Sequence, residues 1–169
     1  MSIVEQHTWM GRELLVTWRD ANFAPPTGPE NQASGICFTE DGMVVLVTTD
    51  GQTWMLPGGH TEPGESAEDA LVREVNEEAC ATVTDLNYLG SQEVRDLADS
   101  IGSTVHYQAL FWARVRLSKF EPRYETKARK LVSPLGVNDV LRWRPSGILD
   151  AIMAAALACE NRARREQHS

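Results

Sequence analysis

Three glutamates in one short stretch, Glu74, Glu77 and Glu78, are the residues best suited to carry chemistry. No glycine or proline interrupts residues 67–79, so the sequence predicts a helix there. Each helical residue advances about 100°, and the i, i+3 and i, i+4 relations bring the three carboxylates within reach of one another. Like charges this close destabilise a helix, and a divalent cation would remove that cost. The spacing therefore predicts a site for a metal ion or for phosphate bound through one.

The loop before this helix has a composition that suits the same chemistry. Gly58 and Gly59 let the backbone approach a ligand closely, and their carbonyl oxygens can coordinate a cation. Arg73 flanks the carboxylates and can pair with one of them, and Glu65 is the nearest partner by sequence outside the row. The helix arc next to the carboxylates is apolar, so we expect the row to border the core instead of the fully solvated face.

The surrounding pattern predicts an α/β fold. Ser66 is a good N-cap for the central helix, and Ser146 is one for a second helix from 148 to about 164. Residues 105–117 alternate with a period of two, which predicts a strand with one face in the core. Two apolar runs flank Asp41-Gly42, a strong hairpin signal. We therefore predict an α/β/α sandwich around a mixed β-sheet. The expected strands cover 33–39, 43–49, 52–56, 82–96 with a break at Gly90-Ser91, 105–117 and 131–135, with turns at 96–103 and a helical turn at 138–142.

The N-terminal part looks different from the rest. One apolar run at 14–18 could be a strand, and the Pro-rich segment 24–31 reads as an extended linker. We expect residues 1–32 to be an extension that packs on the domain or on a second subunit, which makes a homodimer plausible.

Composition limits the class of protein. The formal net charge is −8, which argues against non-specific binding to nucleic acid or to an anionic membrane. The three cysteines are widely spaced and form no CxxC motif, so we expect a reducing compartment. No signal-peptide pattern and no apolar run long enough to span a bilayer is found, and the expected location is the cytoplasm.

The stretch from Gly59 to Ala81 resembles the Nudix box. That pattern is glycine, five residues, glutamate, seven residues, Arg-Glu-aliphatic, one residue, Glu-Glu, one residue, glycine and an aliphatic residue. The matching positions are Gly59, Glu65, Arg73, Glu74, Val75, Glu77 and Glu78. Cys80 stands where the family has glycine, and Ala81 where it has a larger aliphatic residue. The loss of the glycine removes a good C-cap and leaves the helix end less defined.

The resemblance implies a Nudix hydrolase domain at 33–165 with a tail at 166–169. It implies Mg²⁺- or Mn²⁺-dependent hydrolysis of a phosphoanhydride in a nucleoside di- or triphosphate derivative. Glu74, Glu77, Glu78 and the Gly58 carbonyl would hold metal, and Glu65 and Arg73 would organise the site. The general base would be a box glutamate such as Glu77, with Glu125 and Glu121 of the late loop as alternatives.

The substrate stays open at this point. The downstream signatures of several Nudix subclasses are absent, and elimination favours a nucleoside triphosphate or a similar small nucleotide. A catalytically inactive nucleotide sensor is the main alternative, and an isoprenoid diphosphate isomerase is a third, without independent support. Residues that could stack on a base are Trp54, Tyr107, Trp112 and Tyr124; residues that could contact phosphate are Arg95, Arg123, Lys127 and Arg129; for all of them packing or solvated charge is the commoner role.

Overall fold

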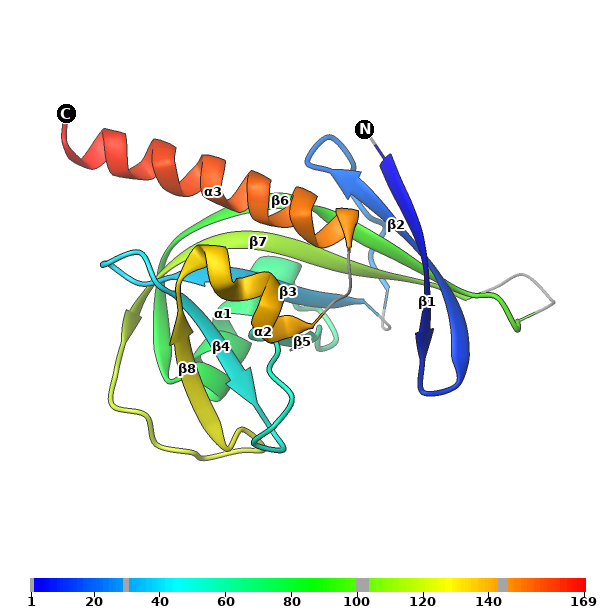
Figure 1. The fold of residues 1–169 in the computed structure, drawn as a ribbon, viewed down its shortest axis with the longest axis horizontal. Helices are drawn as coiled ribbons and strands as arrows, with labels where there is room; N and C mark the ends of the chain where they lie inside the picture. The colour runs from blue at the N-terminus through cyan, green and yellow to red at the C-terminus, as the bar shows by residue number, and fades with distance from the viewer. Residues whose placement is uncertain (1, 29–30, 100–103, 143–145) are drawn as a thin grey trace.

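One mixed sheet forms the centre of the protein (Figure 1). The structure, a computed structural model, describes residues 2–28, 31–99, 104–142 and 146–169. Neighbouring strands run antiparallel except β3 and β7, which are parallel. A short strand, β5 (Gly58–His60), pairs with β3 and lies outside the main order of strands. The order across the sheet is β1 (Ser2–Trp9), β2 (Arg12–Asp20), β6 (Ala81–Asp96), β7 (Val105–Leu117), β3 (Gln32–Phe38), β4 (Val44–Thr48) and β8 (Ala128–Val132).

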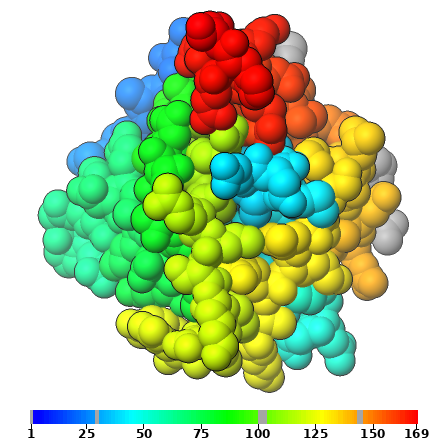
Figure 2. Space-filling view, turned by 90° about the vertical axis from the view of Figure 1, so that its left-hand side faces the viewer, coloured from blue at the N-terminus to red at the C-terminus, as the bar shows by residue number. Residues whose placement is uncertain are grey.

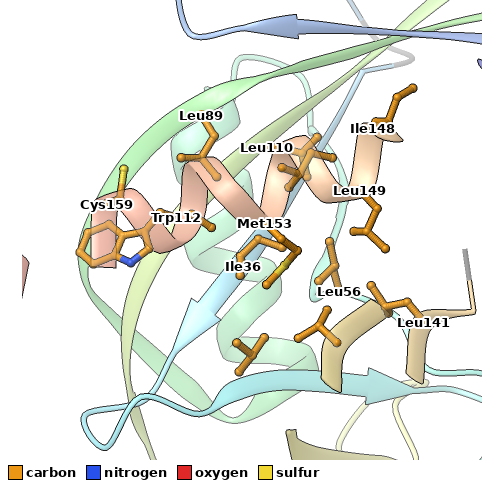
Figure 3. Packing of buried hydrophobic residues seen from close by; sticks show 14 of the residues in the cluster. Ile36, Leu56, Leu89, Leu110, Trp112, Leu141, Ile148, Leu149, Met153 and Cys159 are labelled. Atoms are coloured by element: carbon orange, nitrogen blue, oxygen red, sulfur yellow. The ribbon is translucent and has the colours of Figure 1, made fainter. Parts of the chain in front are cut away.

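The helices cover both faces of the sheet, which confirms the predicted sandwich. The helix α1 (Ala67–Ala79) buries Leu71 and Val75 against one face. On the other face lie a 3₁₀ turn, η1 (Pro134–Gly136), the short α2 (Val137–Leu141) and the long α3 (Gly147–Gln167). Figure 3 shows the apolar cluster between α3 and the sheet, where Met153 faces Ile36 of β3.

The strand β7 is buried on both faces, although its alternation predicted only one core face. Trp112 and Arg114, on the face expected to be polar, are 3% and 7% exposed because α3 covers them. Glu160 of α3 accepts hydrogen bonds from Trp112 Nε1 at 3.0 Å and from Arg114 Nη2 at 2.9 Å. Glu160 thus pairs with two of the polar groups that made this face look solvated, Trp112 Nε1 and Arg114 Nη2, whereas Arg114 Nε has no partner among the described residues.

The N-terminal residues form two strands of the main sheet, where the sequence suggested one strand at 14–18. β1 and β2 make a hairpin, and β2 pairs with β6 in register from Leu14↔Asp96 to Asp20↔Gly90. Glu5 of β1 also reaches the start of α3: its carboxylate accepts from Ser146 Oγ at 2.9 Å and from Ile148 N at 3.0 Å. The hairpin therefore packs on the domain as part of its sheet.

Other boundaries differ from the predictions in smaller ways. Residues 52–56, which were expected to form a strand, make only one isolated bridge, Val47↔Met55. A regular strand forms only after them, at β5. The last strand, β8, begins and ends three residues before the expected strand 131–135, and Pro134 starts a 3₁₀ turn where that strand was expected to continue. The predicted tail 166–169 is helical as far as Gln167. The break at Gly90 is a bulge inside one long strand.

The predicted helix at 67–79 and the hairpin strands around Asp41-Gly42 are confirmed. Parts of the expected linker and turn, residues 29–30 and 100–103, lie outside the described residues. In the described parts of the chain, no helix has an apolar stretch long enough to cross a bilayer.

Candidate active site

The helix α1, which carries the three carboxylates, has a defined cap at each end. Ser66 caps its N-terminus, with Oγ accepting from Asp69 N at 3.1 Å. Its last residue is Ala79, and Cys80 follows in the left-handed conformation with φ 49° and ψ 49°. Cys80 thus adopts the backbone geometry that a glycine would adopt more easily. The helix end is well defined despite the departure from the family pattern.

Arg73 ties the loop to the helix. Its Nε donates to Glu65 Oε1 at 2.8 Å and its Nη2 to Glu65 Oε2 at 3.0 Å, a two-point pair. The same guanidinium donates to Glu74 Oε1 at 2.9 Å and to the His60 carbonyl at 3.0 Å. The Arg73 hydrogen bonds, with one from the Glu62 N–H, lower the pKa of Glu65 to about 2. Arg73 therefore joins Glu65 and the His60 backbone to α1, and the organising role of Arg73 and Glu65 stays a prediction.

Glu78 is the carboxylate of the site whose pKa is raised. Gly58 N donates to its Oε2 at 2.9 Å. Burial raises the pKa of Glu78 to about 7, and the negative charges of Glu74, Glu77 and Glu125 add to this effect. The structure therefore brings Glu125 of the late loop into electrostatic reach of the helix carboxylates.

The two loop glycines are required by close contacts. A Cβ on Gly58 would lie 2.2 Å from the Ala33 carbonyl oxygen, and one on Gly59 would lie 2.5 Å from Glu74 Oε1. Any side chain would push the loop off β3 or away from the carboxylate row. The predicted role of the Gly58 carbonyl as a metal ligand stays a prediction.

The carboxylates lie side by side but do not converge on one point. Among the described residues, no three His, Cys, Asp or Glu side chains are grouped closely enough to hold one ion. Arg73 holds Glu74 and lies 3.5 Å from Glu77 Oε2, while the Gly58 N–H holds Glu78. The candidate metal ligands are all carboxylate or carbonyl oxygens, and the Arg73 guanidinium lies near four carboxylates. In donor type and charge the residues fit Mg²⁺ or Mn²⁺.

The late loop, residues 118–127, runs over the face that Figure 2 shows. Glu121 is exposed there, and its backbone contacts Cys80 Sγ at 3.4–3.5 Å. Arg123 pairs with Glu121 at 3.3 Å instead of facing the helix carboxylates. Tyr124 and Lys127 are exposed.

Three other candidates contact the protein itself. Arg129 Nη1 donates to the Ala79 carbonyl at 2.7 Å and to the Ser118 carbonyl at 3.1 Å, so it caps the C-terminus of α1 instead of contacting phosphate. Trp112 is buried under α3 and cannot stack on a base. Arg95 donates to Glu93 at 3.0 Å.

A cleft of about 920 Å³ leads away from this row along the α3 face of the sheet. Gly58 and Glu78 line one part of it, and the β1–β2 hairpin lines another. Trp54 and Tyr107, two of the residues that could stack on a base, line it, but most of its wall was not predicted from the sequence. The missed lining residues include His7, Trp9, Arg12, Gln92 and Gln108. The one available signal was Gln108, a polar residue between Tyr107 and Ala109 in the predicted strand.

Comparison with known proteins agrees with this geometry. Residues 29–146 match the sequence profile of the NUDIX domain. A putative 8-oxo-dGTP diphosphatase, YtkD of Bacillus subtilis (strain 168), is 33% identical over 97 residues, which are 57% of this chain and 59% of that protein. The NAD-capped RNA hydrolase NudC of Pseudomonas putida (strain W619) is 65% identical over 34 residues, or 20% of this chain. The chain spans about 12% of the length of NudC in that match.

Solved structures show the same fold. The Bacillus subtilis pyrophosphohydrolase BsRppH superposes with a TM-score of 0.57 at 26% identity, covering 75% of this chain and 76% of that one. A NUDIX hydrolase from Nitrosomonas europaea superposes with a TM-score of 0.57 at 18% identity, covering 78% and 90%. Because the profile covers most of the chain and the box carboxylates occupy the expected helix face, this protein belongs to the Nudix hydrolase family.

Proposed function

We propose that this protein is a Mg²⁺- or Mn²⁺-dependent pyrophosphohydrolase that cleaves a phosphoanhydride bond in a nucleoside di- or triphosphate derivative. One observation carries the proposal: the side-by-side carboxylates Glu74, Glu77 and Glu78 meet the Gly58-Gly59 loop at a cleft large enough for a nucleotide. The pyrophosphohydrolase and diphosphatase names of its relatives support the same reaction class.

The residues divide into ligands and organisers. Glu74, Glu77, Glu78 and the Gly58 carbonyl would hold the metal, which when bound neutralises the diphosphate and activates water. Metal has to compete with the hydrogen bonds that now hold Glu74 and Glu78. Arg73 and Glu65 keep the loop against the helix through their two-point pair.

Glu77 is the best candidate for the general base. Its side chain is 31% exposed, against 15% for Glu74, and its nearest contact with Arg73 is at 3.5 Å. It is therefore the box carboxylate least committed to the protein and the freest to take a proton from water. Glu125, whose charge acts on Glu78, is the alternative.

A nucleoside triphosphate is the proposed substrate class. The similarity to a putative 8-oxo-dGTP diphosphatase extends over more than half of this chain and favours it. The match to an RNA-cap hydrolase covers 34 residues, which is too short to carry a substrate over. A nucleotide sensor without catalysis is disfavoured because every box carboxylate is present.

The test is a substrate panel with Mg²⁺ or Mn²⁺ and with EDTA. It should include canonical and oxidised nucleoside triphosphates, sugar nucleotides, ADP-ribose and dinucleoside polyphosphates. We expect metal-dependent release of phosphate or pyrophosphate, and we expect Glu77→Gln to lower kcat by about 10²–10⁴-fold with an unchanged melting temperature. Glu68→Gln, an exposed change on the same helix, is the control. Absence of hydrolysis across the panel, or full activity of Glu77→Gln, would contradict the proposal.

A further inference from the structure

The two outermost strands of the main sheet, β1 and β8, differ in character (Figure 1). β8 is five residues long and carries Arg129 and Lys130, and charged side chains of this kind keep an edge strand from pairing with another chain. β1 is eight residues long and contains no lysine, arginine or proline. Among the described residues it pairs only with β2, so its outer edge offers unpaired backbone groups.

The turn of the N-terminal hairpin determines which residues of β1 offer these groups. Met10 and Gly11 both have positive φ and form a two-residue turn between the partners Trp9 and Arg12. In such a hairpin the residues next to the turn exchange backbone hydrogen bonds, and this pattern alternates along the strand. The outward N–H and C=O groups therefore belong to Ser2, Val4, Gln6 and Thr8.

The side chains of β1 divide between the two faces of the sheet. Ile3 packs against the cluster under α3, and Glu5 accepts from the start of α3, so the odd-numbered residues face that helix. Gln6 and Thr8 instead donate to Glu13 on the other face, at 3.0 and 2.6 Å. Opposite residues of an antiparallel pair are either both hydrogen-bonded to each other or both not. An even-numbered residue of β1 can therefore lie only opposite an even-numbered residue of a second β1.

A second copy of β1 fits this edge when the two strands are antiparallel and centred on Gln6. Glu5 of each copy then lies opposite His7 of the other, and this pair can carry opposite charges. Such a pair makes no backbone hydrogen bonds between the copies, and its Cα atoms lie only about 4.5 Å apart, which brings the side chains together. Val4 lies opposite Thr8, and the outward pairs share about six backbone hydrogen bonds.

The other registers that the backbone allows are less favourable. Centring on Glu5 gains an outward pair but places the two glutamates opposite each other, and like charges in this position are destabilising. Centring on Val4 places Glu5 opposite Ile3, which has no counter-charge. Centring on His7 leaves fewer outward pairs.

We propose that the outer edge of β1 is a homodimer interface, in which two copies pair antiparallel about Gln6 and their two sheets become one. The cleft is affected because residues of β1 form part of its wall. In this register Trp9 of the partner subunit lies opposite Ile3, beside the start of α3, and Ile148 of α3 lines the cleft. The partner thus brings an aromatic side chain next to the cleft wall. The inference is independent of the reaction proposed above.

The test is sedimentation velocity of the full chain over a range of about 1–200 µM, and we expect a dimer with a Kd on the order of 10⁻⁶–10⁻⁵ M, because one added strand makes a small interface. Gln6→Pro removes the central outward N–H, which makes no bond inside the sheet. It should raise the Kd at least about tenfold while the melting temperature stays within about 3 °C of the parent value. Gln6→Ala, the matched control, loses the same side chain but keeps the N–H, and it should dimerise like the parent protein.

His7 tests the register. His7→Glu places two glutamates opposite each other across the interface and should raise the Kd at least about tenfold, whereas His7→Lys keeps opposite charges and should leave it within about threefold. A parent protein that is monomeric at about 200 µM would overturn the proposal. Dimers of Gln6→Pro as tight as those of the parent, or equal Kd values for His7→Glu and His7→Lys, would overturn it as well.

Discussion

Glu78 offers a test of the electrostatics of the site that does not depend on turnover. Its pKa is raised from an ordinary 4.5 to about 7, mainly by burial. At about 1.36 kcal/mol for each pKa unit, ionising Glu78 in the folded protein costs at most ~3.4 kcal/mol. The side chain is only partly buried, and water at the cleft mouth screens it, so we expect about 1–2 kcal/mol.

The sign follows from linkage. When folding raises the pKa of a carboxyl group, the protein has its full stability below the pKa of the unfolded state. Its stability falls as the pH rises through the pKa of the folded state. Without metal, Glu78→Gln should therefore be more stable than the parent protein at about pH 8.5, by about 3–7 °C in melting temperature, and equal to it near pH 4.5. The amide oxygen can still accept from Gly58 N, so the loop contact is kept.

The assay is a set of thermal melts in EDTA at both pH values, with Glu40→Gln as a charge-matched control in an exposed turn. Mg²⁺ added at pH 8.5 should stabilise the parent protein and have a smaller effect on Glu78→Gln. A variant no more stable than the parent at pH 8.5, or one with the same difference at both pH values, would refute the reasoning.

Two further predictions concern the elements that hold the site. Cys80→Gly should stabilise the protein by about 0.5–1 kcal/mol in urea denaturation because glycine adopts the left-handed backbone conformation of this position without strain. Cys80→Ala should bring no such gain, and equal gains in the two variants would show that the backbone conformation is not the cause. Glu160→Leu should destabilise it by about 3–5 kcal/mol in the same assay because Arg114 and Trp112 lose their buried acceptor, and a loss below about 1 kcal/mol would contradict this role.

Local chemistry made part of the site predictable. Ser66 sets the start of α1, and helical spacing alone places Glu74, Glu77 and Glu78 together. The pair between Arg73 and Glu65 spans only eight residues across one loop and helix, so proximity in sequence was a sufficient guide.

Features that depend on distant residues were not predictable from the pattern. Arg129 caps α1 from 50 positions away, and Glu160 lies 46 positions from Arg114, whose burial it permits. The cleft wall depends on the pairing of β2 with β6, which no local signal specifies.

The hairpin at the start of the chain has a consequence for synthesis on the ribosome. Its partner strand in the sheet, β6, follows 70 to 82 residues later, and the partners of Glu5, Ser146 and Ile148, follow 141 and 143 residues later. Pairing across such separations is slow to form. The carboxylate helix can fold against β3 early, but the wall that faces Gln92 closes only when nearly the whole chain has emerged. A truncated nascent chain would therefore form the carboxylate helix before the β1–β2 hairpin completed the wall of the cleft.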